Sequence, residues 1–319
     1  MVAKYNGTYK SNDNVSTIGY VKWSESDKPK AIIQLVHGMA EYIERYEDFA
    51  VFLVGKGYVV YGNNHIGHGS SVASNDDLGH LPGKTGYRYV GEDVHTLKKI
   101  AKREYPNTPY ILLGHSMGSL IARQDAATWG DELDALILSG TSGKNPLSGI
   151  GLLLIDIITM FKGPKYKSKL IYNMAFGSYN KRCSEKRTLY DWLSFNTDNV
   201  DKYVADDKSG FMFTVSGFRN LMALLKNVTS KSWYEEVPKT LPILLISGKE
   251  DPVGAYGAGV IETEQGLKKS GVKDVTMILY DHMRHEILKE TDNMKVYEDI
   301  LEFIDRETEK VKKNDTGTE

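Results

Sequence analysis

The chain has 319 residues, of which 41% are hydrophobic, and it carries 40 lysines and arginines against 42 aspartates and glutamates. Such a length is compatible with one large domain or with a core and a smaller insertion, and the apolar fraction is ample for a packed core. The formal net charge of −2 excludes the basic footprint of a typical nucleic-acid-binding protein. We therefore expect a small-molecule partner and no nucleic acid.

The cysteine content and the hydropathy of the chain indicate the cytoplasm as its compartment. Cys183 is the single cysteine, so no intramolecular disulfide can form, which is typical of a reducing environment. The first residues lack the apolar region of a signal peptide, and no stretch approaches the ~20 apolar residues that span a bilayer. We expect a cytoplasmic protein, whose oligomeric state the sequence does not predict.

Residues 15–23, VSTIGYVKW, alternate apolar and polar side chains after a turn-rich SNDN, which predicts an antiparallel strand at a sheet edge. Apolar runs, typical of strands buried on both faces, then lie at 31–36, 58–62, 110–114, 135–140, 242–248 and 275–280. Helical periodicity marks residues 46–57, 89–105, 120–130 and 258–271. This alternation predicts an α/β fold, a mostly parallel sheet with helices on both faces and ligands at the carboxyl ends of its strands.

One interval breaks the alternation, because roughly a hundred residues separate the runs that end at 140 and begin at 242. The interval has a helical and unusually apolar pattern. We expect a core from residues 1–143 and 237–319, with a helical cap inserted at 144–236. The apolar helices pack on the core, line an acyl pocket, or do both with different faces. Candidates for the pocket lining are Leu153, Ile157, Phe161, Trp192, Phe211 and Phe213.

The segment GHSMGS has the spacing G-x-S-x-G, with Gly114, Ser116 and Gly118 at the fixed positions. The pattern is weak alone, but it falls where an apolar strand meets a helical segment. In a nucleophile elbow the serine occupies a strained turn at such a junction, and the two glycines let neighbouring backbone approach closely. The context therefore predicts that Ser116 is a nucleophile rather than a small residue in a tight turn.

A serine nucleophile needs a histidine base that a carboxylate orients, and an elbow of this kind has them after later strands in the order Ser, Asp, His. Glu250 and Asp251 follow the fifth continuous run, and His282 and His285 follow the sixth. We favour Asp251 because a proline fixes the turn after it, with Glu250 as the alternative. We favour His285 over His282 because a short loop is needed before an imidazole can reach back over the serine.

The negative charge of a tetrahedral intermediate needs backbone N–H donors. One is expected from Met117, the residue after the nucleophile, and the other from Met39 in the loop after the first apolar run. Gly38 permits the backbone turn of this loop, and His37 is interpreted as a brace. His115, beside the serine, is interpreted as structural or solvated.

Metal and nucleotide sites are weaker interpretations. The pairs His65 with His68 and His282 with His285 could suggest a metal, but binding would need further ligands of fixed geometry. Neither a G-x-G-x-x-G nor a P-loop pattern opens a helix after the first run. We expect no metal and no cofactor.

Longer stretches carry a family resemblance. They are HGMAEYIERY from His37, NNHIGHGSS from Asn63, GHSMGS from Gly114, DWLSFNTDNVDKYVADD and GFMFT in the insertion, SGKEDPVG from Ser247 and MRHEILKE from Met283. On these stretches the chain resembles the α/β-hydrolase superfamily, and within it the monoglyceride lipase, lysophospholipase and serine aminopeptidase-like group. The H-G-x-x-E-x-x-x-R-Y and R-H-E-I-L segments are far more specific than the serine pentapeptide.

The resemblance implies a triad of Ser116, Asp251 and His285, oxyanion donors at Met39 and Met117, and a helical cap over the pocket. Relatives often carry an aspartate before the G-H-G turn, where this chain has asparagines; this departure concerns loop bracing and not a triad position. The aminopeptidase label transfers poorly, because the cap has no identifiable acidic anchor for a substrate amino group.

We therefore expect a serine carboxylester hydrolase. The apolar insertion favours monoacylglycerol- or lysophospholipid-like esters, and it leaves open a peripheral membrane contact through the cap. The alternative substrates are short-chain or aryl esters of the feruloyl type. A non-catalytic binding protein on a hydrolase scaffold is disfavoured because no triad member is missing.

Overall fold

The computed structural model describes residues 1–146 and 148–316. The strands of its single sheet are β1 (Ala3–Lys10), β2 (Thr17–Ser24), β3 (Ile32–Val36), β4 (Val59–Asn63), β5 (Tyr110–His115), β6 (Ala135–Ser139), β7 (Ile243–Gly248) and β8 (Val275–Tyr280). Their spatial order is β1-β2-β4-β3-β5-β6-β7-β8. Strands β3 to β8 are parallel, while β1 and β2 run antiparallel to their neighbours. The carboxyl ends of the parallel strands therefore meet at one edge of the sheet.

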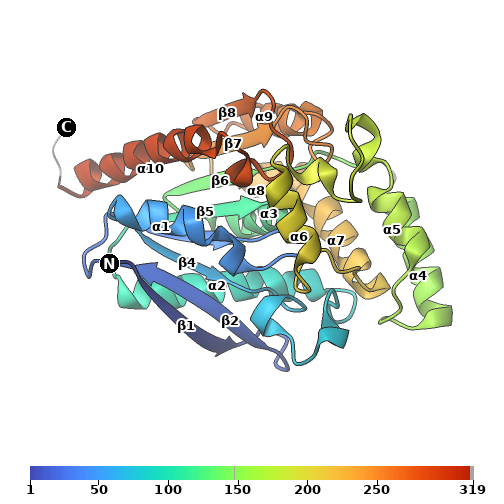
Figure 1. The fold of residues 1–319 in the computed structure, drawn as a ribbon. Coiled ribbons are helices and arrows are strands. Elements are labelled where there is room, and N and C mark those ends of the chain that lie inside the picture. The colour runs from blue at the N-terminus through green and yellow to red at the C-terminus, as the bar shows by residue number, and fades with distance from the viewer. Residues whose placement is uncertain (147, 317–319) are drawn as a thin grey trace.

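Helices cover both faces of the sheet (Figure 1). They are α1 (Glu47–Gly55), α2 (Gly86–Glu104), α3 (Met117–Trp129), α4 (Ser148–Lys162), α5 (Lys169–Phe176), α6 (Thr197–Ala205), α7 (Val215–Val228), α8 (Lys231–Glu236), α9 (Ala258–Lys269) and α10 (Asn293–Thr316). Ile32 joins a core cluster with residues of α2, α3 and α9, whereas Ile33 joins a second cluster with residues of α1 and α10. Successive strand residues thus face opposite layers, and the α/β architecture is confirmed.

The two edges of the sheet differ from the prediction. The segment predicted as an edge strand is β2, and the outer strand is β1, which the sequence pattern did not reveal. Most of β1 is exposed, so it carries no apolar run. At the other edge, Val275–Leu279 of β8 are only half-buried, because an outermost strand is covered less completely than a central one. Helix α10 was also not predicted.

The connection from β6 to β7 contains α4 to α8, and we call it the β6–β7 insertion. Its helices have ordinary starts: Thr214 Oγ1 accepts the N–H of Gly217 at the start of α7, which satisfies a donor that the helix leaves unpaired. Helix α4 packs against α7. Among the described helices, including those of this insertion, none is long and apolar enough to cross a membrane.

Four of the residues suggested for the pocket lining lie elsewhere. Leu153, Ile157 and Phe161 are 63%, 45% and 74% exposed on the outer side of α4. Phe213 is fully buried in the core beneath α7. A helix that packs one side on the protein presents the opposite side to solvent. Because both sides of α4 are apolar, the sequence did not reveal which side faces the protein.

Candidate active site

Most of the predicted site residues line a cavity of about 140 Å³ at the carboxyl ends of the strands. Ser116, His285, Met39 and Met117 all line it. Within residues 110–123, Ser116 is the only residue that is not buried. The serine is therefore the point at which the β5–α3 junction opens into the cavity.

The junction has the strained geometry expected of a nucleophile elbow. Ser116 has φ 55° and ψ −120°, a region that costs a non-glycine residue free energy and persists only where surrounding contacts enforce it. Its N–H donates to the carbonyl of Ser139 at 2.9 Å. A β-carbon at Gly114 would lie 2.3 Å from the carbonyl oxygen of Gly118, and one at Gly118 would lie 2.0 Å from that of Val36. Both glycines are needed for the turn to close.

Asp251 and His285 form a buried pair, with 2.9 Å between the carboxylate Oδ2 and the imidazole Nδ1. The carboxylate also accepts the N–H of Val253 at 2.8 Å and the hydroxyl of Ser247 at 3.2 Å. The alternatives Glu250 and His282 lie apart from the cavity: their side chains are 44% and 93% exposed and face each other at 3.9 Å. The structure thus joins the favoured pair at the cavity and leaves the alternative residues outside it.

The loop after β3 approaches the serine closely. A β-carbon at Gly38 would lie 3.1 Å from Ser116 Cβ. The N–H of Gly38 donates to a side chain of the same loop at 2.6 Å, and the N–H of Ala40 donates to His68 Nε2 at 3.3 Å. Between them, the N–H of Met39 pairs with no acceptor in the described part of the chain. Met117 is the first residue of α3, where helices leave N–H groups unpaired.

Three buried histidines brace this loop. The rings of His37 and His65 lie 3.9 Å apart, and His68 lies 5.2 Å from His37. His37 Nδ1 donates to the Gly38 carbonyl, and its Nε2 accepts the N–H of His65. Burial lowers the pKa of His37 to about 4 and that of His68 to about 3, and it lowers the pKa of His65 as well. The three rings are therefore neutral, and the predicted bracing role of His37 matches these contacts.

Metal binding finds no support in this cluster. Both ring nitrogens of His37 and of His68 already make hydrogen bonds, so they have no free lone pair for a metal. Over residues 1–146 and 148–316, no group of three or more His, Cys, Asp or Glu side chains is arranged to hold a metal ion.

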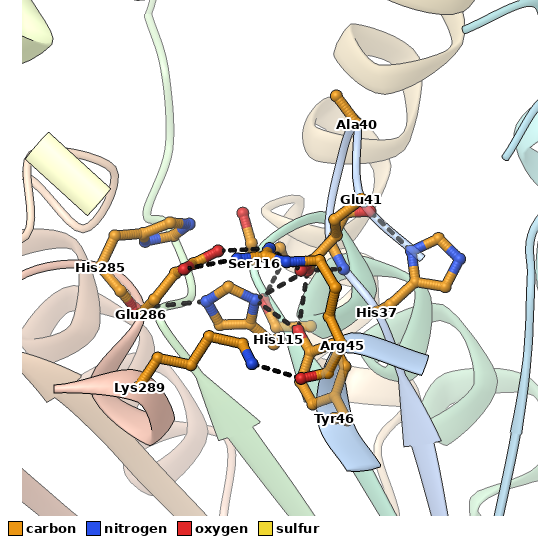
Figure 2. A network of polar contacts seen from close by, with 12 residues as sticks. His37, Ala40, Glu41, Arg45, Tyr46, His115, Ser116, His285, Glu286 and Lys289 are labelled. Atoms are coloured by element: carbon orange, nitrogen blue, oxygen red, sulfur yellow. Dashed lines mark hydrogen bonds and ion pairs between the residues drawn. The ribbon is translucent and has the colours of Figure 1, made fainter. Parts of the chain in front are cut away.

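The sequence analysis missed a polar network behind the serine (Figure 2). His115, interpreted as structural or solvated, is buried and contacts Glu41, Tyr46 and the carbonyl of His285. The i, i+4 pair of Glu41 and Arg45 was a signal in the sequence. Its partner Glu286 could not be identified from spacing, because it lies 241 residues away from Arg45.

The β6–β7 insertion forms the other wall of the cavity, and its lining is mainly aromatic. Two of the suggested residues, Trp192 and Phe211, do line it. The other apolar residues of the insertion that line it were not predicted, and they are Tyr172, Phe176, Tyr179, Tyr190, Leu193, Tyr203, Leu221 and Leu225. The ring of Trp192 lies 5.4 Å from that of His285, so this wall reaches the polar groups directly.

Comparisons with known proteins place the chain among hydrolases. A family described as serine aminopeptidase, S33, matches residues 27–292. The chain is 26% identical to a monoacylglycerol lipase of Mycolicibacterium smegmatis, over 90% of this chain and 92% of that protein. It is 27% identical to the monoglyceride lipase of Homo sapiens, over 90% of this chain and 86% of that protein.

A solved structure is similar along the whole chain. It is a thermostable carboxyl esterase from Bacillus coagulans in complex with glycerol, 32% identical, with a TM-score of 0.89. The match covers 97% of this chain and 100% of the esterase.

Proposed function

The chain belongs to the serine aminopeptidase S33 family and has the α/β-hydrolase fold, and from this premise we propose a serine carboxylester hydrolase for monoacylglycerol- or lysophospholipid-like esters. Its relatives make it a hydrolase of the lipase and esterase type. The assignment of the triad, the substrate and the cap is our own. In it residues 144–236 act as the cap, and residues 1–143 and 237–319 form the core.

In the proposed mechanism, Ser116 Oγ attacks the ester carbonyl while His285 takes its proton. Asp251 holds the imidazole in one tautomer and stabilises the imidazolium that forms, and the N–H groups of Met39 and Met117 bind the oxyanion. Protonation of the leaving alcohol by the histidine gives an acyl-enzyme. Water then releases the acid, with the same histidine as base. Neither a cofactor nor a metal is needed for these steps.

The observation that carries the proposal is the buried pair of Asp251 and His285 beside a strained serine. The carboxylate accepts from Nδ1, which favours the tautomer whose Nε2 carries the lone pair. Ser116 and His285 line the same cavity. A purely structural turn would not need the positive φ of Ser116, since glycine adopts that conformation without cost.

An ester suits the cavity better than a peptide amino terminus. An aminopeptidase needs a free carboxylate to bind the substrate ammonium group. Among the described lining residues, the only carboxylates are those of Glu41 and Glu286. Both are already ion-paired with Arg45 at 2.7 Å, so neither is available as an anchor.

A short-chain or aryl ester is the second candidate. The described cavity, about 140 Å³, is close to the ~150 Å³ of an engineered cavity that holds one benzene molecule. That space fits an aryl or short acyl group without rearrangement, whereas a long acyl chain requires the cap to move. The likeness to a carboxyl esterase favours the same candidate.

Contact with a lipid surface is part of the lipid proposal. The exposed side of α4 and α5 is apolar, with Ile150, Leu153, Ile157, Met160, Phe161, Leu170 and Met174. Both helices lie at one extremity of the molecule (Figure 1). Residues 148–190 contain eight lysines and arginines against Asp156 and Glu185. An apolar helix face with basic surroundings suits an anionic lipid surface. Stronger sedimentation with anionic than with neutral vesicles would support this contact, and equal or no binding would contradict it.

A substrate panel tests the function. We would measure hydrolysis of monoacylglycerols, lysophosphatidylcholine, and short nitrophenyl and feruloyl esters by the wild-type protein and by Ser116→Ala. Long-chain glycerides should be preferred, and the variant should retain its fold. Residual activity above ~1% of wild type would contradict the triad, because removing the nucleophile costs several orders of magnitude. Preference for acetate or feruloyl esters would keep the triad and overturn the lipid substrate.

A further inference from the structure

A buried carboxylate joins the loop after β3 to the residue before the serine. Glu41 is 2% exposed. Its Oε1 accepts the N–H of Gly38 at 2.6 Å and the hydroxyl of Tyr46 at 2.7 Å. The same oxygen lies 3.2 Å from His115 Nδ1. Figure 2 shows Glu41, Tyr46 and His115 next to one another near Ser116.

A second link runs from the same carboxylate to the loop after β8. Arg45 Nη1 donates to Glu41 Oε2 at 2.7 Å, and the guanidinium binds Glu286 through two bonds of 2.7 and 3.0 Å. Glu286 also accepts from Asn199 Nδ2 at 2.7 Å. Because Glu286 directly follows His285, Arg45 ties the loop after β3 to the loop of the proposed base.

The hydrogen bonds around His115 place a proton on each of its ring nitrogens. Tyr46 has one hydroxyl hydrogen, and this hydrogen goes to Glu41. The 2.8 Å contact between Tyr46 Oη and His115 Nδ1 therefore needs an N–H from the histidine. The 3.2 Å contact from Nε2 to the carbonyl oxygen of His285 needs a second one. A ring that donates from both nitrogens is an imidazolium.

The surrounding charges support this state. Burial opposes a charge on His115, but the hydrogen bond and charge of Glu41 outweigh it, so the pKa of His115 is raised. Burial likewise opposes ionisation of Glu41, yet His115 and Arg45 lower its pKa well below its usual value. Two anions, Glu41 and Glu286, thus face two cations, Arg45 and His115. Lys289 also lies close by and donates to the carbonyl of Arg45; burial and Arg45 lower its pKa.

We propose that Glu41 and Glu286 are positioning residues that, through His115 and Arg45, hold three parts of the site together. These parts are the loop with Met39, the elbow of the serine, and the loop of the proposed base. The proposal rests on the function proposed above for the serine and the histidine. It predicts an effect on the chemical step, because displacing a reacting group by about 1 Å can cost ~100-fold in rate.

Stability alone is a weaker explanation for this arrangement. Replacing a buried ion pair by packed apolar groups often leaves stability unchanged or increases it, because desolvation offsets the attraction. A network kept only for stability would not need to end on the main chain of Gly38 and His285, at either side of Ser116. Its end points are the groups whose relative placement the reaction depends on.

The test compares three isosteric variants, Glu41→Gln, Glu286→Gln and Glu307→Gln. Glu307 of α10 is the matched control: it is 2% exposed and its carboxylate likewise accepts from an arginine, Arg306 Nε at 2.6 Å, but it does not line the cavity. With a soluble nitrophenyl ester, kcat should fall about 10- to 100-fold in the first two variants, with KM changed less than about threefold. The control should keep kcat within about threefold of wild type, even if its Tm falls.

A fluorophosphonate separates failure of this proposal from failure of the proposed function. If the wild-type protein neither labels at the serine nor hydrolyses esters, the function fails. If the wild type is active and both folded variants keep its kcat, or if Glu307→Gln loses as much, the positioning role is overturned. Should Glu41→Gln not fold, ¹⁵N-histidine NMR of the wild-type protein decides the question. The signals of His115 are assigned as those that the His115→Asn variant lacks. They should show that both ring nitrogens carry a proton at pH 7. A His115 ring with only one protonated nitrogen at pH 7 would overturn the network.

Discussion

The cavity has two walls, one built by the ends of the strands and the other by the β6–β7 insertion. Different interactions hold these two walls in place. In the first, the backbone of Gly38, Ser116 and Val253 is fixed by directional hydrogen bonds to buried partners. In the second, aromatic rings touch one another, as Phe176 does with Tyr179 at 5.3 Å between ring centroids. Directional bonds fix positions to fractions of an ångström, whereas apolar packing tolerates exchange of side chains of similar volume. Under the proposed function, we therefore expect the first wall to set the chemistry and the second to set the choice of substrate.

The sharpest test of this division lies in the first wall. Asp251→Asn should lower kcat about 10³- to 10⁴-fold with little change in KM, because an amide favours the wrong imidazole tautomer. Steady-state kinetics with nitrophenyl butyrate measure the effect. Glu250→Gln is the control one residue earlier in the chain, half exposed and paired with His282, and it should stay near wild type. An equal loss of kcat in both variants would show that activity depends on the loop as a whole and not on the Asp251 carboxylate.

The buried histidines of the first wall should make the protein sensitive to acid. The pKa of His68 is lowered to about 3, so the unfolded chain binds a proton below about pH 6.5 that the folded protein does not. Stability is then fully present above that pH and is lost as pH falls towards 3, by about 2 kcal/mol at pH 5 for this one residue. Urea unfolding at pH 7 and pH 5 measures the loss, and in His68→Gln the loss should be smaller by that amount.

His115 changes the free energy of unfolding with pH in the opposite direction. Its raised pKa gives stability that is complete below about pH 6.5 and is lost as pH rises through the pKa of the folded state. The histidine that neighbours the serine and those that brace Met39 thus favour different ends of the pH range. A stability profile that rises steadily from pH 7 to pH 5 would contradict the neutral state assigned to His37, His65 and His68.

Sequence alone predicted the first wall far better than the second. The positions of Ser116, Asp251 and His285 follow from where parallel strands end, and parallel strands have a strong apolar signal. The lining of the insertion depends on which side of each helix faces inward, and α4 is apolar on both sides. Phe161 and Phe176 cannot be told apart by composition, yet the first is 74% exposed and the second lines the cavity.

Charged residues that meet across the chain were the other gap in the prediction. Glu41 and Arg45 lie four residues apart, so a local rule could find them. Glu286 joins them only through tertiary packing, 241 residues away from Arg45, and no spacing in the sequence records that contact. β1 was missed for a related reason, since a strand exposed on most of its length has no hydrophobic periodicity to detect.

Filling the second wall should change substrate choice and leave the chemistry intact. Leu225 of α7 lines the cavity, and Leu225→Phe should lower kcat/KM for a long-chain glyceride about tenfold, the usual effect of about 1 to 3 kcal/mol in an apolar pocket. Hydrolysis of nitrophenyl acetate should change less than about twofold. Val204→Phe, on the exposed face of α6, is the control for added volume. An equal loss on acetate and glyceride would mean that the two walls are not independent.

The outer surface of the insertion should show the smallest effect, and only with a substrate held in a lipid surface. Leu153 is 63% exposed on α4, so Leu153→Gln should change the free energy of unfolding by less than about 0.5 kcal/mol. Turnover of a monoacylglycerol in anionic vesicles should fall about fivefold, since partial burial of one leucine contributes about 1 kcal/mol to membrane binding. Hydrolysis of a soluble ester should not change. Val51→Gln, an equivalent change on α1, which Figure 1 shows far from α4 and α5, should leave vesicle turnover intact. Equal turnover of vesicle glyceride by wild type and Leu153→Gln would restrict the insertion to shaping the cavity, with no part in binding a lipid surface.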